Sequence, residues 1–173
     1  MVQQLGEMVR WLKNHLPKYI SNLERKYFMS KLYLAYGSNL NLQQMAHRCP
    51  TARVVATTCL EHYKLTFRGY NGNAVATVEP SENDKVPVMI WEIFDKDEQS
   101  LDIYEGYPRL YRKEYVTVKI NGKKTQVMMY VMNPGRPLGK PSAYYYSTIL
   151  QGYLDARFDK TYLNDGVKRS VRR

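Results

Sequence analysis

Glu105 is the residue of this sequence best placed to move a proton. It stands in the segment Leu101-Asp-Ile-Tyr-Glu-Gly-Tyr-Pro-Arg-Leu-Tyr111, at the expected C-terminus of a helix, where the helix dipole disfavours negative charge. Bulky neighbours such as Tyr104, Tyr107 and Pro108 can shield its carboxyl group from water. Both effects raise the pKa of a carboxyl group toward the range of a general acid and base. The alternative is a solvated glutamate that merely ends a helix.

A second segment, Leu32-Tyr-Leu-Ala-Tyr-Gly-Ser-Asn-Leu40, is typical of a strand that runs into a turn of small polar residues. Gly37 allows backbone conformations closed to other residues, and Ser38 and Asn39 can form local hydrogen bonds. A turn between a strand and a helix can point free N–H groups outward, which favours an anion such as a carboxylate. On these residues alone, a structural turn is as good an interpretation as a ligand-binding one.

Tyrosine is abundant, with 16 in 173 residues. Tyr144, Tyr145 and Tyr146 fall on an expected helix, so only one or two of them can face inward. Tyrosines usually pack with their hydroxyl groups at a surface. A tyrosine that lines a pocket is therefore the less common alternative on composition alone.

Short strands and a few helices must position these residues. The expected strands cover residues 32–36, 54–56, 63–67, 74–78, 86–94, 111–120 and 125–132. Asn41 and Ser142 are suited to cap helices that run to Arg48 and Leu154, and a helix over 95–105 is followed by Gly106 at its C′ position. Asn121-Gly122 fits a type I′ hairpin. These elements predict an α+β domain whose sheet curls toward a barrel.

The expected division of the chain has three parts. Residues 1–28 are typical of an amphipathic helical extension, because apolar residues recur at helical spacing. Residues 29–165 form the domain itself, and residues 166–173 form a basic tail. The extension can dock on the domain, mediate dimerisation or touch a membrane, and docking is the simplest interpretation.

The charge and the cysteine content favour a cytoplasmic protein without a metal site. The net charge of +10 comes mostly from the two ends of the chain, because residues 31–156 hold 15 basic and 12 acidic side chains. A solvated surface explains this better than nucleic-acid or membrane contact. Cys49 and Cys59 fit no metal or disulfide pattern. The chain has neither a signal peptide nor an 18-residue apolar run.

Taken together, the segments resemble the gamma-glutamylcyclotransferase-like family, which includes the AIG2-like proteins. The resemblance runs from about Lys31 to Leu163. It rests on Tyr36-Gly-Ser-Asn-Leu40, on Leu101-Asp-x-x-Glu105-Gly106 and on Pro141-Ser-Ala-Tyr-Tyr145, which occur in the family's order. Many members have a tyrosine seven residues after the glutamate, whereas Tyr111 here follows it by six. That departure suggests the broader bacterial or AIG2-like branch.

The resemblance implies a small mixed-sheet β-barrel flanked by helices and a gamma-glutamylcyclotransferase activity that needs no cofactor or metal. Glu105 would be the catalytic acid and base. The substrate-binding residues would be Tyr36, Gly37, Ser38, Asn39, Leu40, Tyr111 and Tyr145. The partner would be a small gamma-glutamyl molecule, and the protein would act as a monomer or homodimer.

The expected reaction is an attack of the gamma-glutamyl α-amine on the γ-amide carbonyl, which releases 5-oxoproline and an amino acid or amine. Two alternatives belong to other classes of function. One is a carboxylate-binding module on the same fold that does not turn over its ligand. The other is an interaction protein that acts through its basic termini.

Overall fold

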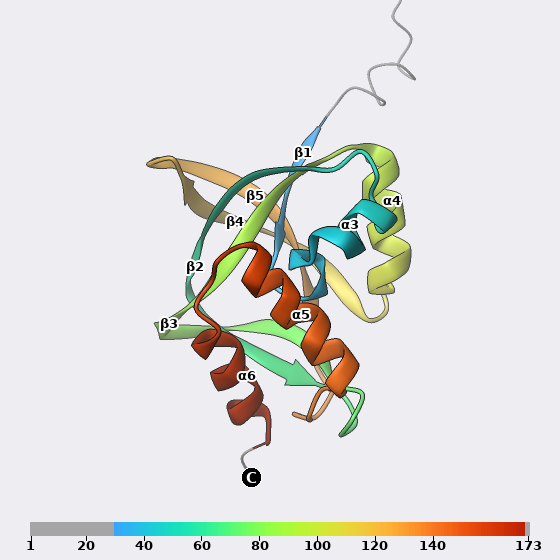
Figure 1. The fold of residues 1–173 in the computed structure, drawn as a ribbon, viewed down its shortest axis with the longest axis vertical. Coiled ribbons are helices and arrows are strands. Elements are labelled where there is room, and N and C mark those ends of the chain that lie inside the picture. Colours follow the sequence, from blue (N-terminus) through green and yellow to red (C-terminus); the bar gives the residue numbers. More distant parts are fainter. Residues whose placement is uncertain (1–29, 172–173) are drawn as a thin grey trace, which may run out of the picture.

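One five-stranded sheet carries most of the fold in the computed structural model, which describes residues 30–171 (Figure 1). The strands are β1 (Lys31–Ala35), β2 (Arg53–Arg68), β3 (Val75–Ile93), β4 (Tyr111–Ile120) and β5 (Lys123–Met132). The helices are the short turn η1 (Ser38–Leu40), α3 (Leu42–Arg48), α4 (Asp95–Glu105), α5 (Ala143–Asp155) and α6 (Thr161–Val171). Residues 1–28, expected to form an amphipathic extension, lie outside the described residues.

The sheet is mixed, with the strand order β2-β3-β1-β5-β4. β1 pairs with β5 in parallel and with β3 antiparallel, and the β2–β3 and β4–β5 pairs are antiparallel. The predicted α+β fold is therefore confirmed. The sheet curls without closing, however: its edge strands β2 and β4 are joined by a hydrogen bond from the Thr58 hydroxyl to the Lys119 carbonyl (2.8 Å) and not by a backbone ladder.

β2 and β3 form one long hairpin where four short strands were expected. The register shifts between Glu61 and Tyr63, where His62 has a positive φ of 64°. On β3 the register jumps from Pro80 to Lys85. The polar residues at this bend interrupt the apolar pattern, so the two halves of each strand look separate in the sequence. A bulge of this kind bends a strand without ending it.

The predicted turns and caps agree with the structure. The Asn41 side chain accepts a hydrogen bond from the Gln44 N–H, and the Ser142 side chain accepts one from the Tyr145 N–H. Gly106 ends α4 in the left-handed conformation, with φ 64°. Asn121 and Gly122 both have positive φ, as a type I′ turn requires. Local signals therefore set the ends of α4 and α5, and these ends carry Glu105 and Tyr145.

The helix α6 is an element that we did not expect. Residues 166–171, assigned above to a basic tail, belong to it, and it packs on β2 with Leu163 and Ser170 buried. The Ser170 hydroxyl accepts a hydrogen bond from the Phe67 N–H (2.7 Å). Two of the basic residues of this region are paired, Lys168 with Asp165 and Arg169 with Asp84. Much of the C-terminal charge is therefore part of the folded domain.

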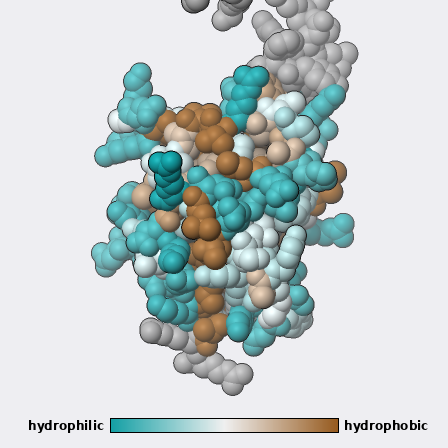
Figure 2. Space-filling view, in the orientation of Figure 1, coloured by the Kyte–Doolittle hydropathy of each residue, from teal (hydrophilic) through white to brown (hydrophobic). Residues whose placement is uncertain are grey.

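Apolar residues gather inside the curl of the sheet and beneath the helices. Figure 2 shows mostly hydrophilic residues on the viewed face, with apolar residues in a narrow band.

Cys49 is buried, Cys59 is half-buried, and both are free thiols. Among residues 30–171, no helix is long and apolar enough to cross a membrane.

Candidate active site

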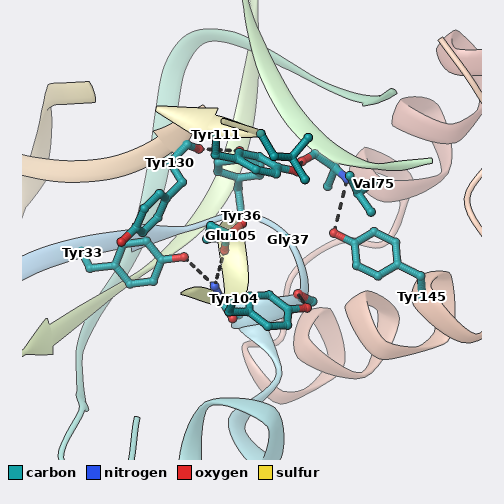
Figure 3. A pocket seen from close by; sticks show the side chains of 13 residues that line it. Tyr33, Tyr36, Gly37, Val75, Tyr104, Glu105, Tyr111, Tyr130 and Tyr145 are labelled. Atoms are coloured by element: carbon teal, nitrogen blue, oxygen red, sulfur yellow. Dashed lines mark hydrogen bonds between the residues drawn. The ribbon is translucent and has the colours of Figure 1, made fainter. Parts of the chain in front are cut away.

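A cavity of about 190 Å³ opens where the turn after β1 meets the end of α4 (Figure 3). β3, β4, β5 and α5 complete its wall. The lining residues are Tyr33, Tyr36, Gly37, Ser38, Asn39, Val75, Ala76, Tyr104, Glu105, Leu110, Tyr111, Tyr130 and Tyr145. Residues far apart in the sequence therefore meet around one small, tyrosine-rich space.

Seven of the eight residues that the sequence singled out line this cavity, and Leu40 does not. The Leu40 side chain is fully buried, and its N–H donates to the Gly37 carbonyl (3.0 Å). The backbone of α5 passes close behind it, since a Cβ atom on Gly152 would lie 2.6 Å from the Leu40 carbonyl carbon. Leu40 thus holds the turn against α5, and its N–H is not free to bind a ligand.

Glu105 is half-buried, and one of its carboxyl oxygens, Oε1, accepts a hydrogen bond from the Asn39 amide nitrogen (2.9 Å). Burial raises the pKa of this carboxyl group to about 7, although the Arg48 charge and the Asn39 hydrogen bond oppose the rise. Tyr107 and Pro108, which we expected to shield it, are themselves exposed. The tyrosine-rich walls of the cavity shield the Glu105 carboxyl group from water instead.

Asn39 is the most connected residue of the site. Its Nδ2 group donates to the Tyr33 hydroxyl (2.8 Å) as well as to Glu105, and its Oδ1 accepts from Arg48 (2.6 Å). Its backbone carbonyl accepts from the Trp91 indole N–H (3.2 Å). With both ends of its amide engaged, Asn39 is a fixed donor to the carboxyl group.

The turn η1 leaves two backbone N–H groups beside the cavity without a partner in the turn itself. The first hydrogen bond of this turn runs from Leu40 to Gly37, so the N–H groups of Ser38 and Asn39 have no acceptor within it. A Cβ atom at Gly37 would lie 3.3 Å from the Ala76 side chain and 3.6 Å from the Tyr145 hydroxyl. A glycine at this position therefore preserves the space beside the free N–H groups.

Tyrosine hydroxyls fix the opposite wall through Ala76 of β3. The Tyr111 hydroxyl donates to the Ala76 carbonyl (2.6 Å), and the Tyr145 hydroxyl accepts from the Ala76 N–H (3.3 Å). The Tyr36 hydroxyl donates to the Tyr130 carbonyl (2.6 Å). Burial raises the pKa of Tyr36, Tyr111 and Tyr145 above the usual value of a phenol, so these hydroxyls stay neutral.

Several lining residues were not predicted as site residues. They are Tyr33, Val75, Ala76, Tyr104, Leu110 and Tyr130. Tyr33 and Tyr104 stand close to the two motifs in the sequence and could have been found from that position. Tyr130 carries no local signal, because the parallel pairing of β1 with β5 brings its strand to the site.

The site contains one carboxyl group, and no cluster of three or more His, Cys, Asp or Glu side chains suited to a metal ion occurs within residues 30–171. His47 and His62 are not among the lining residues. The chemistry available in the cavity is therefore proton transfer by Glu105 and hydrogen bonding by amide and phenol groups.

Fold and site together define an α+β protein with a small, tyrosine-lined cavity around one carboxyl group. The chain belongs to the gamma-glutamyl cyclotransferase, AIG2-like family, whose model matches residues 33–148. It is 29% identical to a gamma-glutamylcyclotransferase of Mus musculus over 133 residues, which are 70% of this chain and 69% of the relative. It is 31% identical to a Bos taurus gamma-glutamylcyclotransferase over 132 residues, 71% of this chain and 70% of the relative.

The fold leads to the same family. A solved gamma-glutamyl cyclotransferase structure superimposes with a TM-score of 0.68 at 27% identity, covering 79% of this chain and 86% of that chain. The predicted membership is therefore confirmed by sequence and by structure.

Proposed function

We propose that this protein is a gamma-glutamylcyclotransferase that converts a gamma-glutamyl amino acid or amine into 5-oxoproline and the free amino acid or amine. The family membership and the names of the relatives support this reaction class. The single observation that carries the assignment is Glu105, a carboxyl group with a pKa raised to about 7 that lines a small cavity.

Glu105 acts first as a base and then as an acid. Its carboxylate takes a proton from the α-ammonium group of the substrate, and the freed amine attacks the γ-carbonyl carbon of the same residue. A five-membered ring forms, the bond to the leaving nitrogen breaks, and Glu105 returns the proton to that nitrogen. The ring nitrogen loses its second proton through the same carboxylate, so the leaving amine departs in its ammonium form. A pKa near 7 suits both steps, because both protonation states are populated at neutral pH.

The remaining residues hold the substrate in the folded shape that ring closure needs. The free N–H groups of Ser38 and Asn39 bind the α-carboxylate or the developing oxyanion. Tyr111 and Tyr145 line the wall with neutral hydroxyl groups. Since the attack is intramolecular, fixing the conformation supplies much of the rate enhancement. No step requires a metal ion or an organic cofactor.

The test is a Glu105→Gln variant assayed for 5-oxoproline release from a panel of gamma-glutamyl amino acids, gamma-glutamyl amines and glutathione. Loss of the general base should lower kcat by about 10²- to 10⁴-fold. Glu92→Gln is the matched control, because Glu92 lies on β3 and is not among the cavity residues. Wild-type turnover by Glu105→Gln would remove Glu105 from the mechanism.

The same panel separates the other two functions. Binding of a gamma-glutamyl ligand with no product from any donor would favour a module that has lost turnover. Salt-dependent binding to nucleic acid or anionic vesicles, abolished by removing residues 1–28, would favour an interaction protein.

We further propose a cytoplasmic location, because Cys49 and Cys59 are both free thiols.

A further inference from the structure

Arg48, at the end of α3, is linked to the catalytic carboxyl group through the Asn39 amide and does not line the cavity. Its guanidinium group donates to the Asn39 Oδ1 atom (2.6 Å) and to Gln44 Oε1 (2.7 Å). The same group lies 3.6 Å from the centroid of the Tyr104 ring, in a cation–π contact. It also donates to the Ser38 hydroxyl (3.4 Å), so four contacts hold Arg48 in place.

The chemistry of the guanidinium group decides which way the Asn39 amide points. An arginine side chain carries only donors, whereas an amide carries an acceptor oxygen at one end and a donor NH2 group at the other. The oxygen of Asn39 must therefore face Arg48. The NH2 group then faces the Tyr33 hydroxyl and Glu105. Reversing the amide would set donors against donors at Arg48.

This orientation makes the two oxygens of Glu105 unequal. Oε1 accepts from the Asn39 NH2 group, and Oε2 has no hydrogen-bond partner within residues 30–171. Oε2 is nevertheless not fully buried. Within residues 30–171, the Tyr153 hydroxyl is the one fully buried side-chain polar atom that lacks a hydrogen-bond partner, so Oε2, which also lacks one, must be accessible. Since Glu105 lines the cavity, Oε2 is the carboxyl oxygen left free to meet a substrate.

We infer that Arg48 is a positioning residue, which locks the Asn39 amide so that Glu105 exchanges its proton with the substrate through Oε2 alone. This inference rests on the proposed function for its kinetic consequences. The locked amide itself is a property of the resting protein, and it can be measured without a substrate.

Arg48 also sets the charge around the carboxyl group. The other titratable side chains at the cavity are phenols from several elements: Tyr33, Tyr36, Tyr104, Tyr111, Tyr130 and Tyr145. Of the described residues, Arg48 is the charged group that lowers the pKa of Glu105. Removing that charge moves the pKa upward, so a base step by Glu105 would need a higher pH.

The experiment compares wild type with Arg48→Met, Arg48→Lys and the control Arg112→Met. Arg112→Met also removes an arginine charge and an ion pair, the one with Glu114, but Arg112 does not line the cavity. Two measurements are made on each protein: the pH profile of kcat/KM for 5-oxoproline release, and the NMR signals of the Asn39 side-chain amide and the Glu105 carboxyl carbon across pH.

Arg48→Met should lower kcat by about 10²-fold, the cost of a small misplacement of reacting groups. It should also move the rising limb of the pH profile and the Glu105 titration to higher pH, and shift the Asn39 amide signals. Arg48→Lys keeps the charge and one donor, so its titration should stay near that of wild type with an intermediate kcat. Arg112→Met should match wild type throughout.

A folded Arg48→Met variant with unchanged amide signals and an unchanged Glu105 titration would overturn the inference, whatever its kcat. Should Arg48→Met fail to fold, an Arg48→Lys variant with the amide signals and the kcat of wild type would overturn it as well. If no donor is turned over even by wild type, the proposed reaction fails, while the NMR measurements still decide the role of Arg48.

Discussion

The Asn39 amide nitrogen and the Glu105 carboxyl group meet at 2.9 Å, although 66 residues separate them in the sequence. One belongs to the turn after the first strand, and the other ends α4. The family's two sequence motifs are therefore two halves of one hydrogen-bonded pair. Changes in either half are expected to alter the behaviour of the other.

The raised pKa of Glu105 should make the protein less stable at alkaline pH. The folded protein keeps this proton up to about pH 7, whereas an ordinary glutamate loses it near 4.5. Between these values the folded state binds more protons than the unfolded state, so stability falls as pH rises. Glu105→Gln removes the effect and should be more stable than wild type by about 1–3 kcal/mol at pH 8, with no such gain at pH 4. Urea unfolding at both pH values measures this, and an equal difference at the two values would contradict it.

Gly37→Ala should weaken substrate binding more than it slows the chemical step. The added methyl group would lie 3.3 Å from the Ala76 side chain and 3.6 Å from the Tyr145 hydroxyl, inside the space beside the turn. We expect KM to rise by about tenfold, the equivalent of about 1.4 kcal/mol. The double variant Gly37→Ala with Ala76→Gly relieves the closer contact and should recover part of the loss. A normal KM in the single variant would show that substrate does not occupy this space.

Tyr145→Phe should impair the site while leaving the fold nearly intact. The Tyr145 hydroxyl accepts from the Ala76 N–H at 3.3 Å, and losing one such bond costs about 1 kcal/mol of stability. We expect a higher KM for gamma-glutamyl donors with a small drop in melting temperature. Tyr144→Phe is the matched control, since Tyr144 is the preceding residue of α5 and is 75% exposed. Similar kinetics for the two variants would contradict a role of Tyr145 in the cavity.

Ser170→Ala should destabilise the whole domain, because α6 is part of it. The Ser170 hydroxyl accepts from the Phe67 N–H (2.7 Å), and the variant leaves that buried donor unpaired at a cost of about 1–3 kcal/mol. Ser100→Ala on α4 is the control, since its hydroxyl lies at the surface and only donates back to the Lys96 carbonyl. Chemical denaturation compares the two. An effect no larger than that of the control would show that α6 contributes little.

The parts that could be predicted depend on local signals. Gly106, Asn121-Gly122, Asn41 and Ser142 each set a turn or a cap through their own conformational preferences, and the structure agrees with them. The site roles of the two motifs, by contrast, were predicted from the resemblance to a family and not from such local signals. α6 was missed because Asn164-Asp165-Gly166 interrupts its apolar pattern, whereas Gly166 is what lets the helix pack against Leu65 of β2.

The parts that could not be predicted depend on contacts between distant segments. Tyr130 reaches the cavity because β1 pairs in parallel with β5, a choice that no short stretch of sequence encodes. Arg48 looks like an ordinary basic residue at a helix end, and its contacts with Asn39 and Tyr104 appear only when α3, η1 and α4 come together. Residues that orient others are harder to find from sequence than residues that carry the chemistry.

Ala76 holds two tyrosines of the cavity wall through its main chain alone. It pairs with Phe67 of β2, and its N–H and carbonyl groups also engage the hydroxyls of Tyr145 and Tyr111. A change of side chain at position 76, proline excepted, therefore keeps both anchoring groups in the chain. The two tyrosines are free to vary in evolution only together with a replacement for the phenol hydroxyl, whereas the residue that holds them is constrained in size alone.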